Sequence, residues 1–323
     1  MRSALASLLL LFAACATRPT SAGEFAAALP SVTCSAAELP SIDGPSGASL
    51  QIIAVGDAGE PGPQLTRTIE AMKKVDGLDA LLLAGDNVYR CGLRDASDSN
   101  WQRVIAPLFV LGKPIYPVLG NHDWGRRAIP GCAFSTPGAE IARNGLWQFP
   151  APAYTVMTDV AEFIMIDSSP IAYGWPDRMP EALCAVRGAL ARPKTRPWRI
   201  VVGHHPLFSC GEHGAEDATQ NMRTALQQLF AEAKVDLYVA GHDHDLELPS
   251  APAPPAYVVS GAGSKIRKRG AQCPEGETFR IVGGFALLDI SASDLDIRVY
   301  CNGSEAPCME RRVGASLSPE HQP

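Results

Sequence analysis

Five short blocks, each beginning with glycine and carrying acidic, amide or histidine side chains, most constrain how this 323-residue chain can fold. They are GDAG at Gly56, GDNVY at Gly85, GNHD at Gly120, GHH at Gly203 and GHDH at Gly241. Each follows an apolar run typical of a buried strand: IIAV, LLLA, IYPVL, WRIVV and LYVA. The blocks are therefore expected at strand C-terminal ends, where open α/β sheets bind ligands. Because six of the seven histidines lie in or beside these blocks, we interpret them together as one dinuclear metal site.

The segments between the blocks predict a layered α/β fold. Strands expected at 51–55, 78–84 and 114–119 alternate with helices near 63–74 and 98–110.

After residue 145 the pattern changes. Two apolar runs at 153–158 and 161–167 predict a hairpin, and helices near 180–191 and 217–232 then alternate with strands that end at residues 202 and 240. Three β-rich pieces, AYVVSGAG, GGFALLDIS and LDIRVYC, follow without a helix between them. Together these elements indicate one domain of two packed β-sheets with helices outside.

Composition favours small molecules as the partners of this chain. The hydrophobic content of 46% is enough for a sizeable core. A net charge of −6 argues against a general nucleic-acid binder, which usually carries a basic face.

The N-terminus predicts export. Residues 1–15 have the arginine, apolar run and small-residue ending of a signal peptide, and the run is too short to span a bilayer. FAAC resembles a bacterial lipobox that ends at Cys15, so lipidation of this cysteine and ordinary cleavage after Ala16 or Ala22 are alternatives. We expect a flexible tether at 16–48, the folded domain at 49–312 and a C-terminal tail at 313–323.

The cysteines support export independently. Without Cys15 the nine cysteines become eight, an even number that suits disulfides in an oxidising compartment. No CxxC pair is present, so a thiolate zinc cluster is not expected. Eight cysteines allow 105 connectivities, which the sequence leaves open.

The blocks supply carboxylate, amide and imidazole groups, a ligand set that suits Fe, Mn or Zn. The candidate ligands are Asp57, Asp86, Asn121, His204, His242 and His244. A carboxylate can bridge two cations, and Asp86 is the central candidate. Tyr89 lies three residues further on, and a phenol becomes a ligand only when a strongly acidic cation replaces its proton, which indicates Fe(III).

In these blocks the chain resembles the metallophosphoesterase superfamily, and GDNVY resembles the purple acid phosphatases, most of all the small, tartrate-resistant type. GHHPLFSCGEHG, YVAGHDHDLEL, YVVSGAG and GGFALLDI are also similar to that family's segments, so the resemblance runs from Gln51 to Ile290. It implies a four-layer αββα sandwich of two mixed β-sheets flanked by helices.

The resemblance also implies a role for each residue. Fe(III) would be bound by Asp57, Asp86, Tyr89 and His244, and a divalent Fe, Zn or Mn ion by Asp86, Asn121, His204 and His242. His122 and His213 match histidines that contact the substrate phosphate or leaving group. His205 stands where the family commonly has an aromatic residue, so we do not expect it among the ligands. The spacer from Asp167 to Arg199 is short for the family, which affects the expected shape of the substrate entrance.

The activity implied is that of an exported acid phosphatase, a monomer of the periplasm, cell envelope or medium. It would hydrolyse phosphomonoesters by in-line attack of a metal-activated hydroxide, on small phosphorylated substrates, phosphoproteins or nucleotides. Two alternatives stay open: a phosphodiesterase or nucleotide phosphohydrolase on the same metal core, and a non-enzymatic envelope protein that binds metal or phosphate. The basic run Lys265, Arg267, Lys268 and Arg269 is interpreted either as a solvated loop or as a cationic rim for phosphorylated substrates.

Overall fold

The computed structural model of the chain describes residues 24–26, 29, 32–34, 38–137, 145–250, 254–270, 273 and 278–314. The expected signal peptide at 1–15 and residues 315–323 of the expected tail lie outside the described residues. Within the described part, no helix has the length and apolar character needed to cross a membrane.

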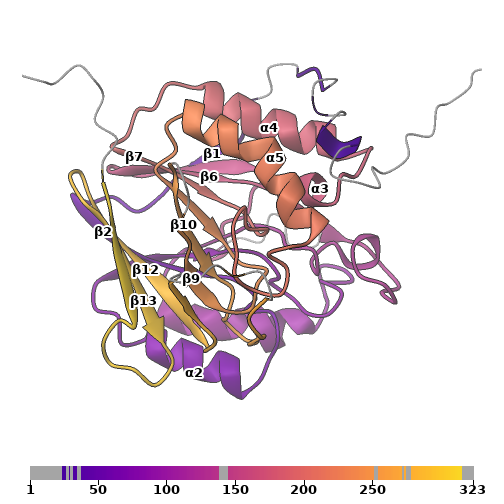
Figure 1. The fold of residues 1–323 in the computed structure, drawn as a ribbon. Coiled ribbons are helices and arrows are strands. Elements are labelled where there is room, and N and C mark those ends of the chain that lie inside the picture. The colour runs from indigo at the N-terminus through magenta and orange to yellow at the C-terminus, as the bar shows by residue number, and fades with distance from the viewer. Residues whose placement is uncertain are drawn as a thin grey trace, which may run out of the picture.

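Two mixed β-sheets form the centre of the molecule (Figure 1). The eight strands of one sheet run in the order β1 (Ser41–Asp43), β5 (Tyr154–Met157), β6 (Ala161–Met165), β7 (Trp198–Val202), β8 (Leu237–Ala240), β10 (Ala256–Ser260), β9 (Leu246–Leu248) and β11 (Thr278–Arg280). The six of the other run in the order β14 (Met309–Val313), β13 (Leu295–Cys301), β12 (Gly284–Ser291), β2 (Ser49–Val55), β3 (Leu78–Leu83) and β4 (Ile115–Pro117). This confirms the expected two-sheet sandwich.

Period-two alternation explains the layers. In β7, Trp198, Ile200 and Val202 pack into the core that the sheets share, whereas Val201 packs into a second core under the helices. Three helices, α3 (Ser169–Ala172), α4 (Met179–Ala191) and α5 (Asp217–Glu232), contribute to that second core. Helix α2 (Pro63–Met72) lies on the side of the six-stranded sheet (Figure 1). The order of layers is therefore helix, sheet, sheet, helix.

The predicted hairpin is confirmed, because β5 pairs with β6 in antiparallel fashion. The helical stretch expected near 98–110 is confirmed, although it is not a regular α-helix. Its residues form a π-helical turn at Trp101–Ile105 followed by a 3₁₀ helix at Ala106–Leu111. Pro107 has no backbone N–H to donate, which explains why a regular α-helix does not continue through this segment.

The expected tether at 16–48 is wrong for its described part. Ser41 of β1 lies opposite Thr155 in the eight-stranded sheet, and Phe25 is fully buried in the core under the helices. Cys34 forms a disulfide with Cys184 of α4. The stretch is rich in Ala, Ser and Pro, and its isolated apolar residues show no helical or strand periodicity. The sequence pattern therefore did not indicate that this segment packs on the domain.

All eight cysteines outside Cys15 form disulfides, as their even number predicted. The pairs are Cys34–Cys184, Cys91–Cys132, Cys210–Cys273 and Cys301–Cys308. Two of them, Cys91–Cys132 and Cys210–Cys273, close loops that follow the metal-site blocks.

Arg199 of β7 ties the eight-stranded sheet to two helices. Its Nε donates to Glu162 Oε1 over 2.6 Å, and both side chains are buried. The remaining guanidinium nitrogens donate to carbonyls at the C-terminal ends of α4 and α5: Leu190, Arg192 and Ala233. These carbonyls lack helical partners, so Arg199 both pairs a buried carboxylate and caps two helices.

Replacing Arg199 with alanine should therefore lower the free energy of unfolding by about 3 to 5 kcal/mol, because Glu162 would stay buried without its partner. Urea denaturation followed by circular dichroism measures this change. Arg312→Ala, which removes an exposed ion pair with Asp296, is the control and should leave the midpoint where it is. An unchanged midpoint in Arg199→Ala would contradict this account of the pair.

Candidate metal centre

The five blocks meet where the two sheets end. Strands β2, β3 and β4 are mutually parallel neighbours in one sheet, and β7 and β8 are parallel neighbours in the other. Each block follows the C-terminal end of one of these strands, as the sequence predicted. Three block residues adopt a left-handed backbone conformation: Asp57 with φ 56°, Asp86 with φ 54° and His242 with φ 70°. Such conformations are unfavourable for residues other than glycine and cluster at functional sites.

Three candidate ligands from different elements form a first triangle of donor atoms. Tyr89 Oη lies 2.8 Å from Asp57 Oδ1 and 3.0 Å from His244 Nε2. The third edge, from His244 Nε2 to Asp57 Oδ1, is 3.2 Å. The structure thus brings together the three residues assigned to one ion.

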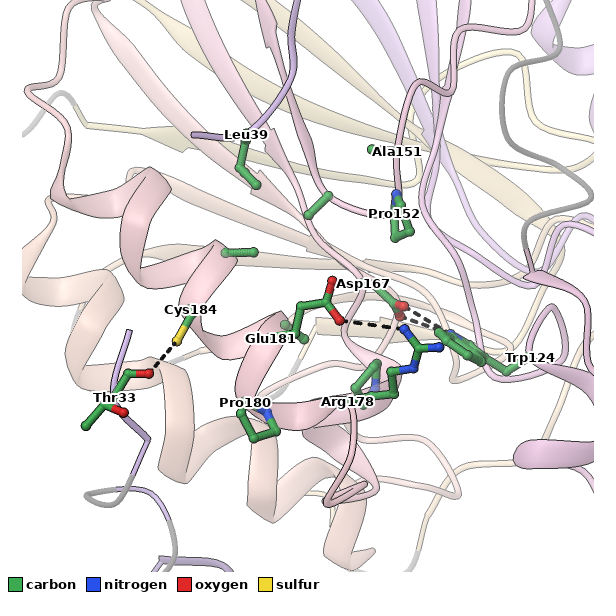
Figure 2. Close-up of a pocket in the computed structure, with 14 residues that line it drawn as sticks. Thr33, Leu39, Trp124, Ala151, Pro152, Asp167, Arg178, Pro180, Glu181 and Cys184 are labelled. Atoms are coloured by element: carbon green, nitrogen blue, oxygen red, sulfur yellow. Dashed lines mark hydrogen bonds and ion pairs between the residues drawn. The ribbon is translucent and has the colours of Figure 1, made fainter. Parts of the chain in front are cut away.

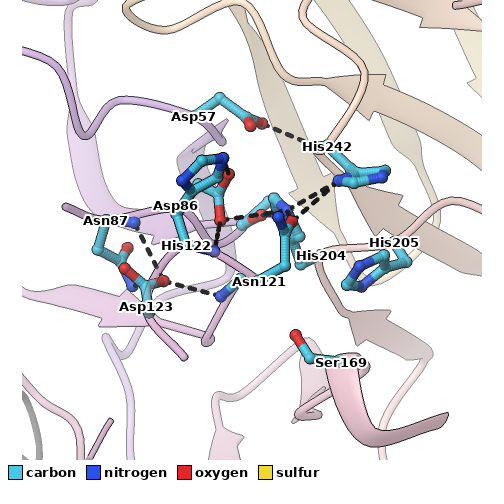
Figure 3. Close-up of polar contacts among 12 residues, drawn as sticks. Asp57, Asp86, Asn87, Asn121, His122, Asp123, Ser169, His204, His205 and His242 are labelled. Carbon is cyan, nitrogen blue, oxygen red and sulfur yellow. Dashed lines mark hydrogen bonds and ion pairs between the residues drawn. The ribbon is translucent and has the colours of Figure 1, made fainter. Parts of the chain in front are cut away.

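The other three form a second triangle (Figure 3). Asn121 Oδ1 lies 3.0 Å from His204 Nε2 and 3.1 Å from His242 Nδ1, and these two nitrogens are 3.2 Å apart. The Nδ1 of His204 meets the carbonyl of Ala84 at 2.8 Å, which orients Nε2 toward the triangle.

Asp86 lies between the triangles. Its Oδ1 is 3.4 Å from His204 Nε2 of the second triangle, and its carboxylate also interacts with Tyr89 of the first. Burial alone would raise the pKa of Asp86, but His204 and His122 outweigh it, and the pKa is lowered to about 2. The side chain is therefore an anion throughout the physiological range and suits the bridging position.

The geometry of both triangles fits metal ions. Their edges measure 2.8 to 3.2 Å. Two ligands about 2.1 Å from one cation at right angles would lie roughly 3.0 Å apart. Burial and then the carboxylates of Asp57 and Asp86 raise the pKa of Tyr89 well above its usual value, so this phenol needs a strongly acidic cation to lose its proton.

Backbone amides lock neighbouring blocks to one another. Asp57 Oδ2 accepts from the amide of His242 at 2.8 Å, and Asp86 Oδ1 accepts from the amide of His122 at 2.8 Å. Gly85 has φ 84°, and a Cβ atom there would lie 2.6 Å from His204 Nδ1. Only glycine leaves room for the imidazole at this strand end.

The two histidines expected to handle protons lie beside different triangles. The His122 ring packs edge-on against Tyr89, with centroids 4.4 Å apart, and its Nδ1 lies 2.6 Å from the carbonyl of Arg90. The His213 ring stacks on His242 at 4.3 Å. Burial alone would lower the pKa of His213, but its Nδ1 lies 2.9 Å from Glu216 Oε1, and this contact, together with the nearby carboxylates, raises the pKa above its usual value.

His205 lies against the second triangle without belonging to it. Its ligand nitrogen comes within 4.8 Å of those of His204 and His242, so proximity alone would add it to the ligands. The Ser168 hydroxyl oxygen accepts hydrogen bonds from the backbone amides of His204 and His205, both at 3.0 Å. The hydroxyl therefore donates its own hydrogen bond to His205 Nδ1, 2.9 Å away. In the neutral ring Nε2 then carries the proton, which favours the exclusion of His205 from the ligand set.

Sequence reasoning missed several carboxylates that hold the blocks. Asp123 is fully buried and accepts from the amides of Gly120, Asn87 and Val88, which joins the second block to the third. Burial, with Asp86 adding to it, raises the pKa of Asp123 to about 7. Asp123 stands in GNHD, so its place in the motif was the available signal.

Asp243 and Glu247 act in the same way on the loop that carries His213. Asp243 Oδ1 accepts from the His213 amide at 2.9 Å, and Glu247 accepts from the amides of Cys210 and Gly211. Asp243 lies in GHDH and Glu247 follows it, but the partners of both are more than 25 residues away in sequence.

The short spacer between Asp167 and Arg199 lines a cavity of about 490 Å³ next to Trp124 (Figure 2). The indole of Trp124 donates to Asp167, and Arg178 pairs with Glu181 at 3.6 Å. Burial raises the pKa of Asp167 to about 7. The rest of the lining is mostly apolar, so this cavity does not have the character of a phosphate site.

Gly85→Ala should displace His204 and reduce the metal content of the purified protein to less than half, because both the added methyl group and the φ angle oppose the native arrangement. Elemental analysis per chain measures this. Gly77→Ala is a matched control, since Gly77 has φ 69° but open space around it. It shares the backbone strain without the clash and should keep its metal; equal losses in both variants would contradict the packing argument.

Comparison with known proteins agrees with this geometry. The model of the calcineurin-like phosphoesterase family matches residues 50–246. Purple acid phosphatase 17 of Arabidopsis thaliana is 30% identical over 68% of this chain and 70% of its own length. Tartrate-resistant acid phosphatase type 5 of Homo sapiens is 27% identical over 87% of this chain and 96% of its own.

Two solved structures share the fold. Purple acid phosphatase PPD1 from yellow lupin seeds superposes with a TM-score of 0.60 at 16% identity, covering 84% of this chain and 55% of that one. GAP50, an anchor in the inner membrane complex of Plasmodium, superposes with a TM-score of 0.70 at 19% identity, covering 84% and 90%. The chain belongs to the calcineurin-like phosphoesterase family and is a metallophosphoesterase of the purple acid phosphatase kind, an enzyme that hydrolyses phosphoesters.

Proposed function

We propose that this protein is an exported acid phosphatase that hydrolyses phosphomonoesters at a dinuclear Fe(III) and divalent metal site. The observation that carries the proposal is the pair of donor triangles, Asp57, Tyr89 and His244 on one side and Asn121, His204 and His242 on the other, with the Asp86 carboxylate between them. When bound there, two cations supply the positive charge that acidifies water and neutralises phosphate oxygens.

The remaining steps belong to the chain's own residues. The carboxylates and imidazoles of the two triangles orient the site, and the backbone contacts between blocks keep it rigid before substrate arrives. Hydrolysis requires that the ester oxygen receive a proton as its bond to phosphorus breaks. His122 and His213 are the groups placed to donate it, because each lies at the edge of one triangle and is less buried than the ligands.

Tyr89 supports Fe(III) rather than a second divalent ion on its side of the site. The phenol lies within the first triangle and its proton is held tightly by Asp57. A trivalent cation is the partner best able to replace that proton. The divalent partner, Fe, Zn or Mn, would take the side with two imidazoles and an amide, which suits borderline metals.

Export to the periplasm, cell envelope or medium is supported by the four disulfides. A non-enzymatic role, such as that of an anchor with the same fold, is less well supported. A pure binder would need neither the histidines beside the triangles nor the complete set of donor side chains.

An aryl phosphate monoester should be hydrolysed at least about tenfold faster, as kcat/KM, than the matched diester, because the site can neutralise the dianionic group fully. Asp86→Asn should lose at least about a hundredfold of this activity, whereas Asp76→Asn, an exposed control, should keep it. A strong diester preference would overturn the monoester assignment. Full activity in Asp86→Asn would overturn the catalytic hypothesis.

Iron-loaded protein should absorb in the visible region through a tyrosinate-to-iron transition, and Tyr89→Phe should abolish that band while iron analysis shows metal still present. Tyr154→Phe is the matched control, because Tyr154 is buried but its hydroxyl donates to the carbonyl of Pro117 instead. A band that persists in Tyr89→Phe would refute the ferric assignment.

A further inference from the structure

A basic cavity opens beside the first triangle. It has a volume of about 710 Å³, and Tyr89 and His122 form part of its wall, so it is continuous with the metal centre. Four basic side chains and one carboxylate, Glu60, also line it. The basic residues are Arg90, Arg103, Lys265 and Arg267. The wall therefore carries a net positive charge, although the chain as a whole has a net charge of −6. This contrast indicates a site that binds an anion.

Two of the four cations already have partners. Lys265 pairs with Glu60 at 2.5 Å and lies 3.7 Å above the Tyr89 ring. Arg267 contacts His213 and lies 4.0 Å from Glu212. Of the basic run in the sequence, Lys265 and Arg267 line this cavity, whereas Lys268 and Arg269 do not. Half of the run therefore lies where the cationic-rim interpretation requires it.

The other two carry charge without a nearby carboxylate. Arg90 donates to the carbonyl of Pro130 at 3.1 Å, and Arg103 donates to Asn100 Oδ1 at 3.2 Å. Among the residues that the structure describes, no carboxylate lies within 4.0 Å of either guanidinium. Both side chains are exposed, so a ligand can reach their remaining donors.

The wall that carries Arg90 is fixed relative to the reaction centre. The backbone carbonyl of Arg90 lies 2.6 Å from His122 Nδ1, and the next residue, Cys91, forms a disulfide with Cys132. Pro130, which accepts from the Arg90 side chain, belongs to the same closed loop. A guanidinium held in this way can bind phosphate oxygens with little loss of conformational freedom.

We propose that this cavity binds a second phosphate group of the substrate, with Arg90 and Arg103 as its main contacts, so that small molecules bearing two phosphate groups are preferred. The inference rests on the phosphatase activity proposed above. The scissile phosphate occupies the metal centre, and the second stays intact: water adds to phosphorus, the P–O bond to the leaving oxygen breaks, and that oxygen gains a proton. The limited volume favours small molecules over a protein chain.

Two matched substrate pairs test the preference in the metal-loaded enzyme. Fructose 1,6-bisphosphate is compared with fructose 6-phosphate, and ADP with AMP. The substrate with two phosphate groups should have a kcat/KM at least about tenfold higher, mostly through a lower KM, and the advantage should shrink at high salt. Preference in only one pair identifies the second phosphate as part of an ester or of an anhydride.

The double variant Arg90→Gln and Arg103→Gln should lose at least about tenfold in kcat/KM on the preferred substrate, but less than about threefold on its partner with one phosphate. Arg280→Gln removes one positive charge from an exposed arginine away from the cavity; it controls for the loss of charge outside the site and should alter both by less than about twofold. Equal kcat/KM within both pairs, or a preference that survives in the double variant, would overturn the inference. No hydrolysis of any of the four substrates, or of an aryl phosphate, would instead overturn the proposed phosphatase function.

Discussion

The burial of two carboxylates where both sheets end governs the rest of this structure. Asp57 and Asp86 are almost completely inaccessible to solvent, yet Asp86 has a pKa of about 2 and therefore stays charged. A buried anion is tolerated only when positive charge or hydrogen-bond donors surround it. Here the donors are backbone amides of neighbouring blocks and histidines from the opposite sheet, so the electrostatic requirement of the site also holds the two sheets together.

The sequence predicted the parts of the fold and the site that depend on local pattern. Apolar runs followed by glycine and a polar block identified five strand ends, and parallel pairing then brings those ends to one edge. The assignment of ligands to two ions relied on residue type and family resemblance. Each triangle contains the three residues that were assigned to one ion. This grouping follows from the order of the strands more than from any single residue.

Features that depend on contacts between distant residues could not be predicted. Ser168 fixes the tautomer of His205 from 37 residues away, and Glu247 holds the loop at Cys210 across a similar separation. The segment before residue 48 has no periodic pattern, although Phe25 fills the core and Cys34 is covalently linked to α4. The pairing of the disulfides likewise depends on tertiary packing. The basic run indicated only part of the basic cavity, because Arg90 and Arg103 join Lys265 and Arg267 through the fold.

Anomalous X-ray diffraction from crystals of the metal-loaded protein locates each metal ion relative to its ligands. The dinuclear assignment predicts two metal peaks, one among Asp57, Tyr89 and His244 and the other among Asn121, His204 and His242, with Asp86 between them. Data collected on both sides of the iron edge should assign iron to the peak next to Tyr89. A single peak, or a peak bound by His205 in place of one of these ligands, would contradict it.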